Sequence, residues 1–273
     1  MGFLKSFFGG KEQSPEEKQE KESAYQFDVL KTEGVRALHT GKWDYAVKCL
    51  NKALDIKDDL EVHDYLSQAY IQNEQFRKGY EQLQLLSAAQ PDNINILTTM
   101  ARVAYMMEDF QAMSEACEKS LLIDKDHADT MFLYARAALA QKDMVNAVAM
   151  YTKTLMLDEN FAAAYLERGN TLLQMGDLEG AEEDADHLMQ LAGNDEDVLL
   201  LKGRVLMARQ RPSEAIEMFD KAIEGNPFST IAYRERGAAR LALGDKEGAE
   251  ADLRQLLEID PKALEDVNGA FKS

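Results

Sequence analysis

Small and apolar residues recur along this chain at a fixed interval. The clearest copy is residues 162–191, AAAYLERGNTLLQMGDLEGAEEDADHLMQL, and residues 231–257, IAYRERGAARLALGDKEGAEADLRQLL, repeat much of it 68 positions later. The shared residues are Tyr165, Glu167, Arg168, Gly169, Gly176, Asp177, Glu179, Gly180, Ala181, Glu182 and Asp184, which return as Tyr233, Glu235, Arg236, Gly237, Gly244, Asp245, Glu247, Gly248, Ala249, Glu250 and Asp252. Because 68 is twice 34, the pattern predicts a structural unit of 34 residues.

Each unit predicts two helices joined by a short turn. The predicted turns are Gly41-Lys42, Glu108-Asp109, Lys142-Asp143, Gly176-Asp177, Arg211-Pro212 and Gly244-Asp245. Most second helices carry a small residue where the two helices cross, which lets their axes approach closely: Ala46, Ala147, Ala181, Ala215 and Ala249. Gly79 and Met113 depart from this pattern. Since no segment alternates Val, Ile and Thr as a strand does, the chain is predicted to be all-α.

The 34-residue period, with its spacing of small, aromatic and proline positions, resembles the tetratricopeptide repeat family. The resemblance implies a right-handed α-solenoid of seven helix-turn-helix repeats with a short C-terminal capping helix. The repeats span residues 27–59, 60–93, 94–127, 128–161, 162–195, 196–229 and 230–263, which leaves 1–26 as an N-terminal tail and polar helical lead-in. In residues 264–273, Leu264, Val267 and Phe271 lie at helical spacing, so we expect this cap to cover the last repeat.

The N-terminus carries a small apolar cluster of Phe3, Leu4, Phe7 and Phe8. Three hypotheses stay open for it: a terminus without a function, a docking peptide, and a weak association with a membrane surface. Ser14, Pro15 and two glutamates then predict the start of a helix, because serine caps exposed amides and proline tolerates the first helical position.

Composition narrows the class of partner. The formal net charge is −18, from 49 acidic and 31 basic residues, which argues against nucleic acid because phosphates require a basic face. No apolar run approaches the roughly 18 residues that a membrane-spanning helix needs. Cys49 and Cys117 are too few for a disulfide framework and predict reduced, buried thiols. We therefore expect a cytoplasmic protein.

Motifs of catalysis are absent from the sequence. The histidines His39, His63, His127 and His187 are scattered, and there is no paired Cys-x-x-Cys and no glycine-rich phosphate loop. We expect no enzymatic activity, no cofactor and no metal site. An enzyme or sensor of small anions would need convergent polar groups in one pocket, which the sequence does not indicate.

The resemblance implies a concave groove lined by the second, fifth, ninth, twelfth and thirteenth residues of each repeat. The ninth residues are Val35, Gln68, Arg102, Arg136, Asn170, Arg204 and Ala238, and Arg234 occupies a fifth position. Tyr105, Phe132, Leu139, Leu166, Leu173, Leu200, Met207 and Leu241 are predicted to form an apolar floor around them. Arginine binds carboxylates with two hydrogen bonds, so the peptide-binding residues we predict are Arg102, Arg136, Asn170, Arg204, Arg234, Tyr105 and Phe132.

Two alternatives compete with this prediction. The arginines could instead pair with nearby acids such as Asp129 and Asp197 and only keep the groove soluble. The chain could also be an assembly scaffold that uses its convex face, its N-terminal Phe cluster or self-association. The family's carboxylate clamp for chaperone C-termini is not expected in its standard form: Lys31 fits it, but Val35 replaces the required asparagine.

Overall fold

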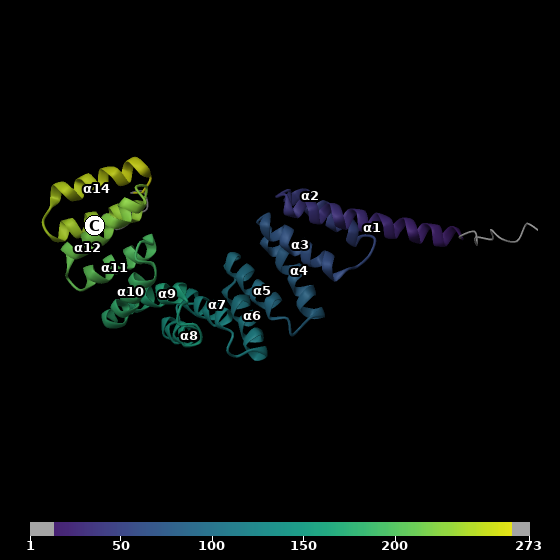
Figure 1. The fold of residues 1–273 in the computed structure, drawn as a ribbon, viewed down its shortest axis with the longest axis horizontal. Helices are drawn as coiled ribbons and strands as arrows, with labels where there is room; N and C mark the ends of the chain where they lie inside the picture. Colours follow the sequence, from purple (N-terminus) through teal and green to yellow (C-terminus); the bar gives the residue numbers. More distant parts are fainter. Residues whose placement is uncertain (1–13, 264–273) are drawn as a thin grey trace, which may run out of the picture. The chain divides into compact units, whose positions relative to one another are not determined.

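The computed structural model describes residues 14–263, and all the regular secondary structure in that range is α-helical (Figure 1). The chain divides into two compact units, Met1–Lys125 and Asp126–Ser273. The N-terminal Phe cluster and the predicted cap at 264–273 both lie outside the described residues.

Fourteen helices follow one another in the described part of the chain, two to each repeat. The first unit holds α1 (Pro15–His39), α2 (Trp43–Leu54), α3 (Leu60–Gln72), α4 (Phe76–Ala89), α5 (Ile94–Met106) and α6 (Phe110–Ile123). The second unit holds α7 (Ala128–Ala140), α8 (Met144–Leu157), α9 (Ala162–Met175), α10 (Leu178–Ala192), α11 (Glu196–Ala208), α12 (Pro212–Gly225), α13 (Thr230–Ala242) and α14 (Lys246–Ile259). The predicted all-α solenoid of helix pairs is confirmed.

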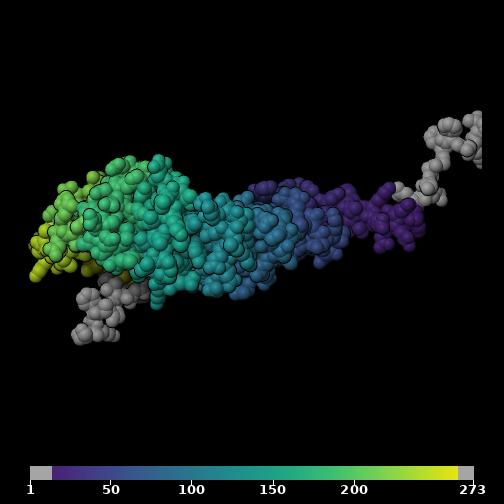
Figure 2. All heavy atoms as spheres, turned by 90° about the horizontal axis from the view of Figure 1, so that it is seen from below, coloured from purple at the N-terminus to yellow at the C-terminus, as the bar shows by residue number. Residues whose placement is uncertain are grey.

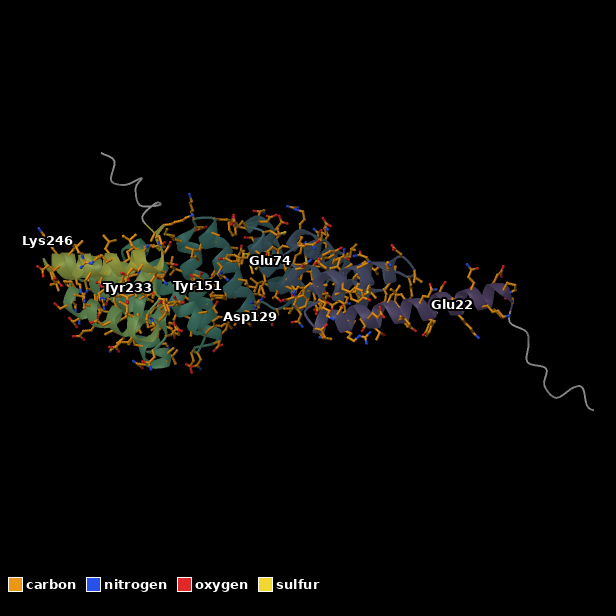
Figure 3. All side chains as sticks on the ribbon, turned by 90° about the horizontal axis from the view of Figure 1, so that it is seen from above. Glu22, Glu74, Asp129, Tyr151, Tyr233 and Lys246 are labelled. Atoms are coloured by element: carbon orange, nitrogen blue, oxygen red, sulfur yellow. The ribbon has the colours of Figure 1, made fainter. Side chains whose placement is uncertain are left out.

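Helix α1 begins as the sequence predicts. Ser14 Oγ accepts the amide of Glu17 at 3.1 Å, and the Glu17 carboxylate accepts the amide of Ser14 at 2.9 Å. Residues 14–26 are all exposed, and Figure 3 shows Glu22 on this stretch with side chains pointing outward around the helix. Burial starts at Phe27, where the repeat pattern begins.

One residue per repeat takes the left-handed conformation in the turn between the two helices. These residues are Gly41, Glu74, Glu108, Lys142, Gly176, Gln210 and Gly244, with φ between 57° and 83°. In four repeats the next residue is an aspartate whose carboxylate caps the second helix: Asp109, Asp143, Asp177 and Asp245. In repeat six the left-handed residue is Gln210, one position before the predicted Arg211-Pro212, because Pro212 already opens α12.

Buried side chains form the core between successive helices in each unit, and Figure 2 shows the closely packed atoms of the outer surface. Leu50, Leu66 and Tyr70 belong to the core of repeats one and two, and fully buried Tyr151 belongs to the core of repeats four and five. Ala46, Ala147, Ala181 and Ala215 have no exposed surface, and Ala249 has 7%. The alanines predicted at the helix crossings are therefore all buried, as close approach of two helices requires.

Candidate binding surface

The predicted binding residues all lie on the first helices of their repeats. Arg102 and Tyr105 are on α5 in the first unit, and the other five are on α7, α9, α11 and α13 in the second unit. Direct contacts join α1 to α3 in the first unit and α9 to α11 and α11 to α13 in the second, so these first helices lie side by side. We call the side formed by these helices in each unit its first-helix face.

On α7 an aromatic platform supports Arg136. Its guanidinium carbon lies 5.9 Å from the centre of the Phe132 ring, within the range of a cation–π interaction. The Phe132 ring in turn lies 5.8 Å from Tyr151 and 5.0 Å from Phe161, measured between ring centres. Because these three rings are packed together, the half-buried Phe132 has a fixed position beneath the charge.

Two arginines converge on a single carboxylate farther along this face. Arg204 Nε lies 3.3 Å and Arg234 Nη2 lies 3.6 Å from the same oxygen, Oε1 of Glu235. The side chain of Arg234 is 60% exposed, whereas those of Arg204 and Glu235 are 32% and 24% exposed. The hypothesis that nearby acids neutralise the arginines is thus partly right for Arg204 and Arg234, but the acid is Glu235 and not Asp197. These three side chains together keep one net positive charge.

Two predicted residues contribute less to this face than the sequence indicates. The Nδ2 of Asn170 donates to the backbone carbonyl of Leu166 at 3.0 Å, so one amide donor is directed into its own helix. The prediction that Leu200 belongs to the apolar floor is wrong, because this residue is 3% exposed and packs in a core with Phe219 and Ala232. Leu241, by contrast, is 60% exposed.

The first-helix face of the first unit has a different chemistry. Lys31 Nζ lies 3.2 Å from Asp59 and 2.5 Å from Glu61. Burial disfavours the charged lysine, but hydrogen bonds to the two carboxylates outweigh this and raise the pKa of Lys31. The lysine that fits the carboxylate clamp therefore already has two acidic partners within the chain. Arg102 is exposed on α5, and the Tyr105 ring lies 6.1 Å from that of Phe110.

A cavity of about 650 Å³ lies among α3, α4 and α5 in this first unit. Carboxylates and amides line it, including Glu61, Asp64, Gln68 and Asn95. Burial raises the pKa of the Asp64 carboxyl, although Gln68 Nε2 donates to it at 3.0 Å. This cavity thus carries two carboxylates, Glu61 and Asp64, whereas the first-helix face of the second unit carries arginines.

A ladder of basic residues on first helices was not assigned a role from the sequence. Arg168, Lys202 and Arg236 are 34 residues apart, and each reaches a side chain 16 residues earlier, on the preceding helix: Thr152 at 3.0 Å, Asp186 at 2.5 Å and Asp220 at 2.6 Å. Arg168 and Arg236 also hold Asp184 and Asp252 through paired hydrogen bonds. The sequence contains a signal for these pairs, since Arg168 and Asp184 recur 68 residues later as Arg236 and Asp252. The spacing alone does not say which helices are in contact.

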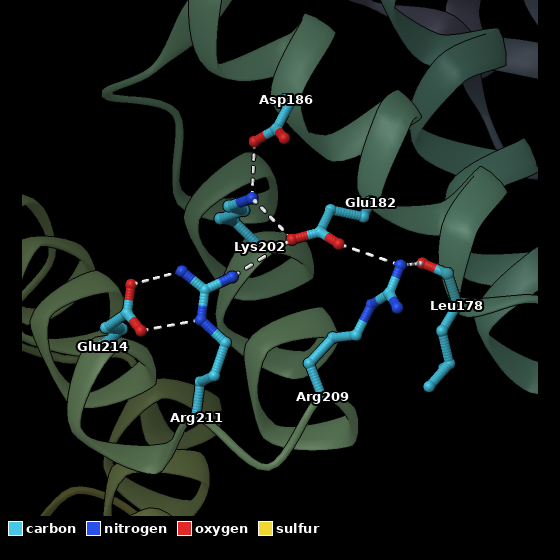
Figure 4. A network of polar contacts seen from close by, with 7 residues as sticks. All are labelled: Leu178, Glu182, Asp186, Lys202, Arg209, Arg211 and Glu214. Atoms are coloured by element: carbon cyan, nitrogen blue, oxygen red, sulfur yellow. Dashed lines mark hydrogen bonds and ion pairs between the residues drawn. The ribbon is translucent and has the colours of Figure 1, made fainter.

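Glu182 on α10 lies at the centre of a second group of ion pairs, drawn in Figure 4. Its carboxylate lies 2.9 Å from Arg209, 3.3 Å from Arg211 and 3.9 Å from Lys202. Arg211 makes two further hydrogen bonds to Glu214, and Arg209 donates to the carbonyl of Leu178. With Asp186, which pairs with Lys202, the group holds three acids and three bases, so it joins repeats five and six without net charge.

The chain matches known repeat proteins by sequence. Residues 162–195 and 200–263 match models of the tetratricopeptide repeat family. This chain is a tetratricopeptide repeat protein. It is 26% identical over 181 residues to Hsp70-Hsp90 organizing protein 1 of Glycine max, an alignment that covers 62% of this chain and 30% of that protein. The chain thus spans less than a third of the length of that relative.

Solved structures share the fold. A tetratricopeptide repeat protein from Parabacteroides merdae superimposes with a TM-score of 0.72 at 14% identity, covering 86% of this chain and 94% of that one. YrrB, described as a TPR protein with an unusual peptide-binding site, gives a TM-score of 0.56 at 16% identity and covers 68% and 96% of the two chains. These similarities establish a shared arrangement of helices.

Several other features bear on function. Among residues 14–263, no cluster of three or more His, Cys, Asp or Glu side chains could hold a metal ion. None of the helices described is long and apolar enough to cross a membrane. Both cysteines are buried and unpaired, and burial raises the pKa of Cys117 to about 12. Tetratricopeptide repeats generally act as non-enzymatic interaction modules, so the family matches indicate no catalytic class.

Proposed function

We propose that this protein is a non-enzymatic interaction module that binds a protein or peptide partner through carboxylate groups, along the first-helix face of its second unit. Its family and its relative named for organising Hsp70 and Hsp90 support a protein partner. The observation that carries the proposal is the shared carboxylate: within residues 14–263, Arg204 and Arg234 share Glu235 as their acidic partner, and Arg234 is mostly exposed. A partner carboxylate fits this excess of guanidinium donors.

The apolar surroundings strengthen such contacts. Arg136 lies over the Phe132 ring. In the last repeat, Arg234 and the exposed Leu241 line one cavity. Guanidinium groups above apolar surface suit an extended or helical peptide that alternates acidic and apolar residues. We place this activity in the cytoplasm, a location supported by the two unpaired cysteines.

The test compares two triple variants of the full chain. Arg136→Gln/Arg204→Gln/Arg234→Gln removes three positive charges from the first-helix face. Lys153→Gln/Lys221→Gln/Arg254→Gln removes three from exposed positions on the second helices α8, α12 and α14. Circular dichroism first establishes that both variants keep the helicity of the wild type.

Binding is then measured by fluorescence anisotropy with labelled decapeptides that alternate Glu with Leu, and with Gln in place of Glu. We expect the wild type and the second-helix variant to prefer the Glu peptide at least tenfold, more strongly at low salt. The first-helix variant should lose this preference. Equal affinity of the wild type for both peptides would refute the proposal.

A scaffold role remains the second candidate, because apolar side chains are exposed at the ends of second helices. Leu122 on α6 is 86% exposed and Met156 on α8 is 81% exposed, at the same position of successive repeats. Neither lies on a first-helix face. Replacing each with Gln should leave peptide binding unchanged but weaken self-association or assembly, measured by analytical ultracentrifugation, if these exposed side chains bind a partner.

A further inference from the structure

The last repeat has an apolar cavity that no described helix covers. It measures about 490 Å³ and lies between α13 and α14, lined by Tyr233, Gly237, Leu241, Ala249, Leu253 and Leu256. Leu241 is 60% exposed and Leu253 is 42% exposed. In repeats five and six the next first helix packs here, since α11 packs on α9 and α13 packs on α11. Repeat seven therefore has surface suited to one more apolar segment.

The edge of the cavity indicates which segment that is. Ala263, the last residue described, is itself part of the lining, so the chain continues from the edge of the cavity. The ten residues that follow, LEDVNGAFKS, place Leu264, Val267 and Phe271 at steps of three and four. A segment with that spacing has one apolar side if it is helical.

Charge complementarity also favours residues 264–273 as the segment that occupies the cavity. Arg234 and Lys246 lie in the lining, and Glu250 is the acidic residue among them. The segment contributes Glu265 and Asp266 directly after its first apolar residue. Because the segment is covalently attached at the cavity edge, its effective concentration there is about millimolar, well above that of a free partner.

We propose that residues 264–273 bind in this cavity of the same molecule and act as an internal ligand that competes for Arg234. The competition rests on the proposed function, since Arg234 also belongs to the first-helix face. The segment then lowers the affinity of the protein for acidic peptides until a stronger ligand displaces it from Arg234. The cavity is thus a regulatory site filled by the chain's own C-terminal residues.

Disulfide capture tests the docking without any peptide. The full chain carrying Leu253→Cys and Phe271→Cys is oxidised at low micromolar concentration; the native Cys49 and Cys117 are buried and unreactive. The matched control moves the first cysteine to Arg254, whose side chain is 67% exposed and which does not line the cavity. We expect an intramolecular disulfide to form at least tenfold faster in the first protein. Equal rates place Phe271 away from Leu253 and, together with unchanged exchange in the variant below, overturn the proposal. A disulfide-linked dimer overturns it in favour of a second copy.

A second pair of variants covers the case in which Phe271 and Leu253 are not neighbours. Val267→Asp/Phe271→Asp places charges on the apolar positions, and Asn268→Asp/Ser273→Asp adds the same charges elsewhere in the segment. Docking predicts that only the first variant accelerates hydrogen exchange of α14 amides, by tenfold or more. Unchanged exchange in that variant, together with equal disulfide rates, overturns docking.

The same variants separate docking from competition. If the segment competes for Arg234, Val267→Asp/Phe271→Asp binds the acidic decapeptide at least threefold more tightly than the wild type. Faster α14 exchange without tighter binding supports docking and refutes the competition. If the acidic peptide does not bind the wild type at all, the proposed function fails while the exchange and disulfide results still decide the docking.

Discussion

At the scale of single residues, two glycines of repeat six have opposite constraints although both lie in helices. A Cβ atom built on Gly203 would lie 2.3 Å from Cε1 of Phe219, whose ring is fully buried. A Cβ on Gly225, the last residue of α12, would meet nothing within 4 Å beyond its chain neighbours and the backbone of its own helix. Glycine is therefore required at the first position, where α11 and α12 are in close contact, and not at the second.

Gly203→Ala should destabilise repeat six by about 1–3 kcal/mol, because the gain in helix propensity is smaller than the cost of overpacking against Phe219. Gly225→Ala, the matched control, should be neutral or stabilise by up to about 1 kcal/mol. Urea unfolding followed by circular dichroism measures both. Equal stability of the two variants would mean that Phe219 can move aside at little cost.

At the scale of helices, buried ion pairs join the two helices of a repeat. Asp184 is 2% exposed, and Arg168 holds both of its oxygens, at 2.6 and 2.9 Å. These bonds raise the pKa of the Arg168 guanidinium. Asp252 is equally buried but has two partners, Arg236 and Arg240, the latter at 2.9 Å. The two aspartates occupy equivalent positions, but Asp184 in repeat five is bound by one arginine and Asp252 in repeat seven by two.

Arg168→Met should cost about 3–5 kcal/mol, because it leaves the buried Asp184 carboxylate without its charged partner. Arg236→Met should cost less, since Arg240 still contacts Asp252. The double variant Arg168→Met/Asp184→Leu should recover most of the loss, because apolar groups of similar shape then replace both charges. Thermal unfolding of the single and double variants measures this coupling, and additive losses in the double variant would contradict it.

The helix pairs themselves could be predicted from the sequence, but these contacts could not. The 34-residue period marks where helices and turns alternate, because close crossings need small residues at Ala147 and Ala181 and the turns carry polar residues or glycine. The period predicts turns at Glu108 and Lys142, but nothing in the side chains of Glu108, Lys142 and Gln210 predicts a left-handed conformation, since all three are ordinary helix formers. Glu235 as the shared partner of two arginines depends on how α11 lies beside α13, which no spacing along one helix reveals.

At the scale of the whole chain, substantial contacts join helices that are one or two apart in the sequence. Stability in such an array is close to a sum of repeat energies and neighbour interfaces, so local changes stay local. The chain also divides at Lys125 into units with separate sets of internal contacts. These observations indicate that unfolding is not a single two-state transition.

The Arg168→Met variant therefore tests how far a local loss of stability spreads along the chain. By hydrogen exchange with mass spectrometry, amides of α9 and α10 should exchange at least tenfold faster in this variant, because their repeat loses a buried pair. Amides of α3, where Val62 and Leu66 are fully or almost fully buried in the first unit, should keep the wild-type rate. Arg254→Gln on exposed α14 surface is the control and should leave both regions unchanged. Faster exchange in α3 of the Arg168→Met variant would show that the two units unfold together, since only cooperativity along the whole array carries the effect that far.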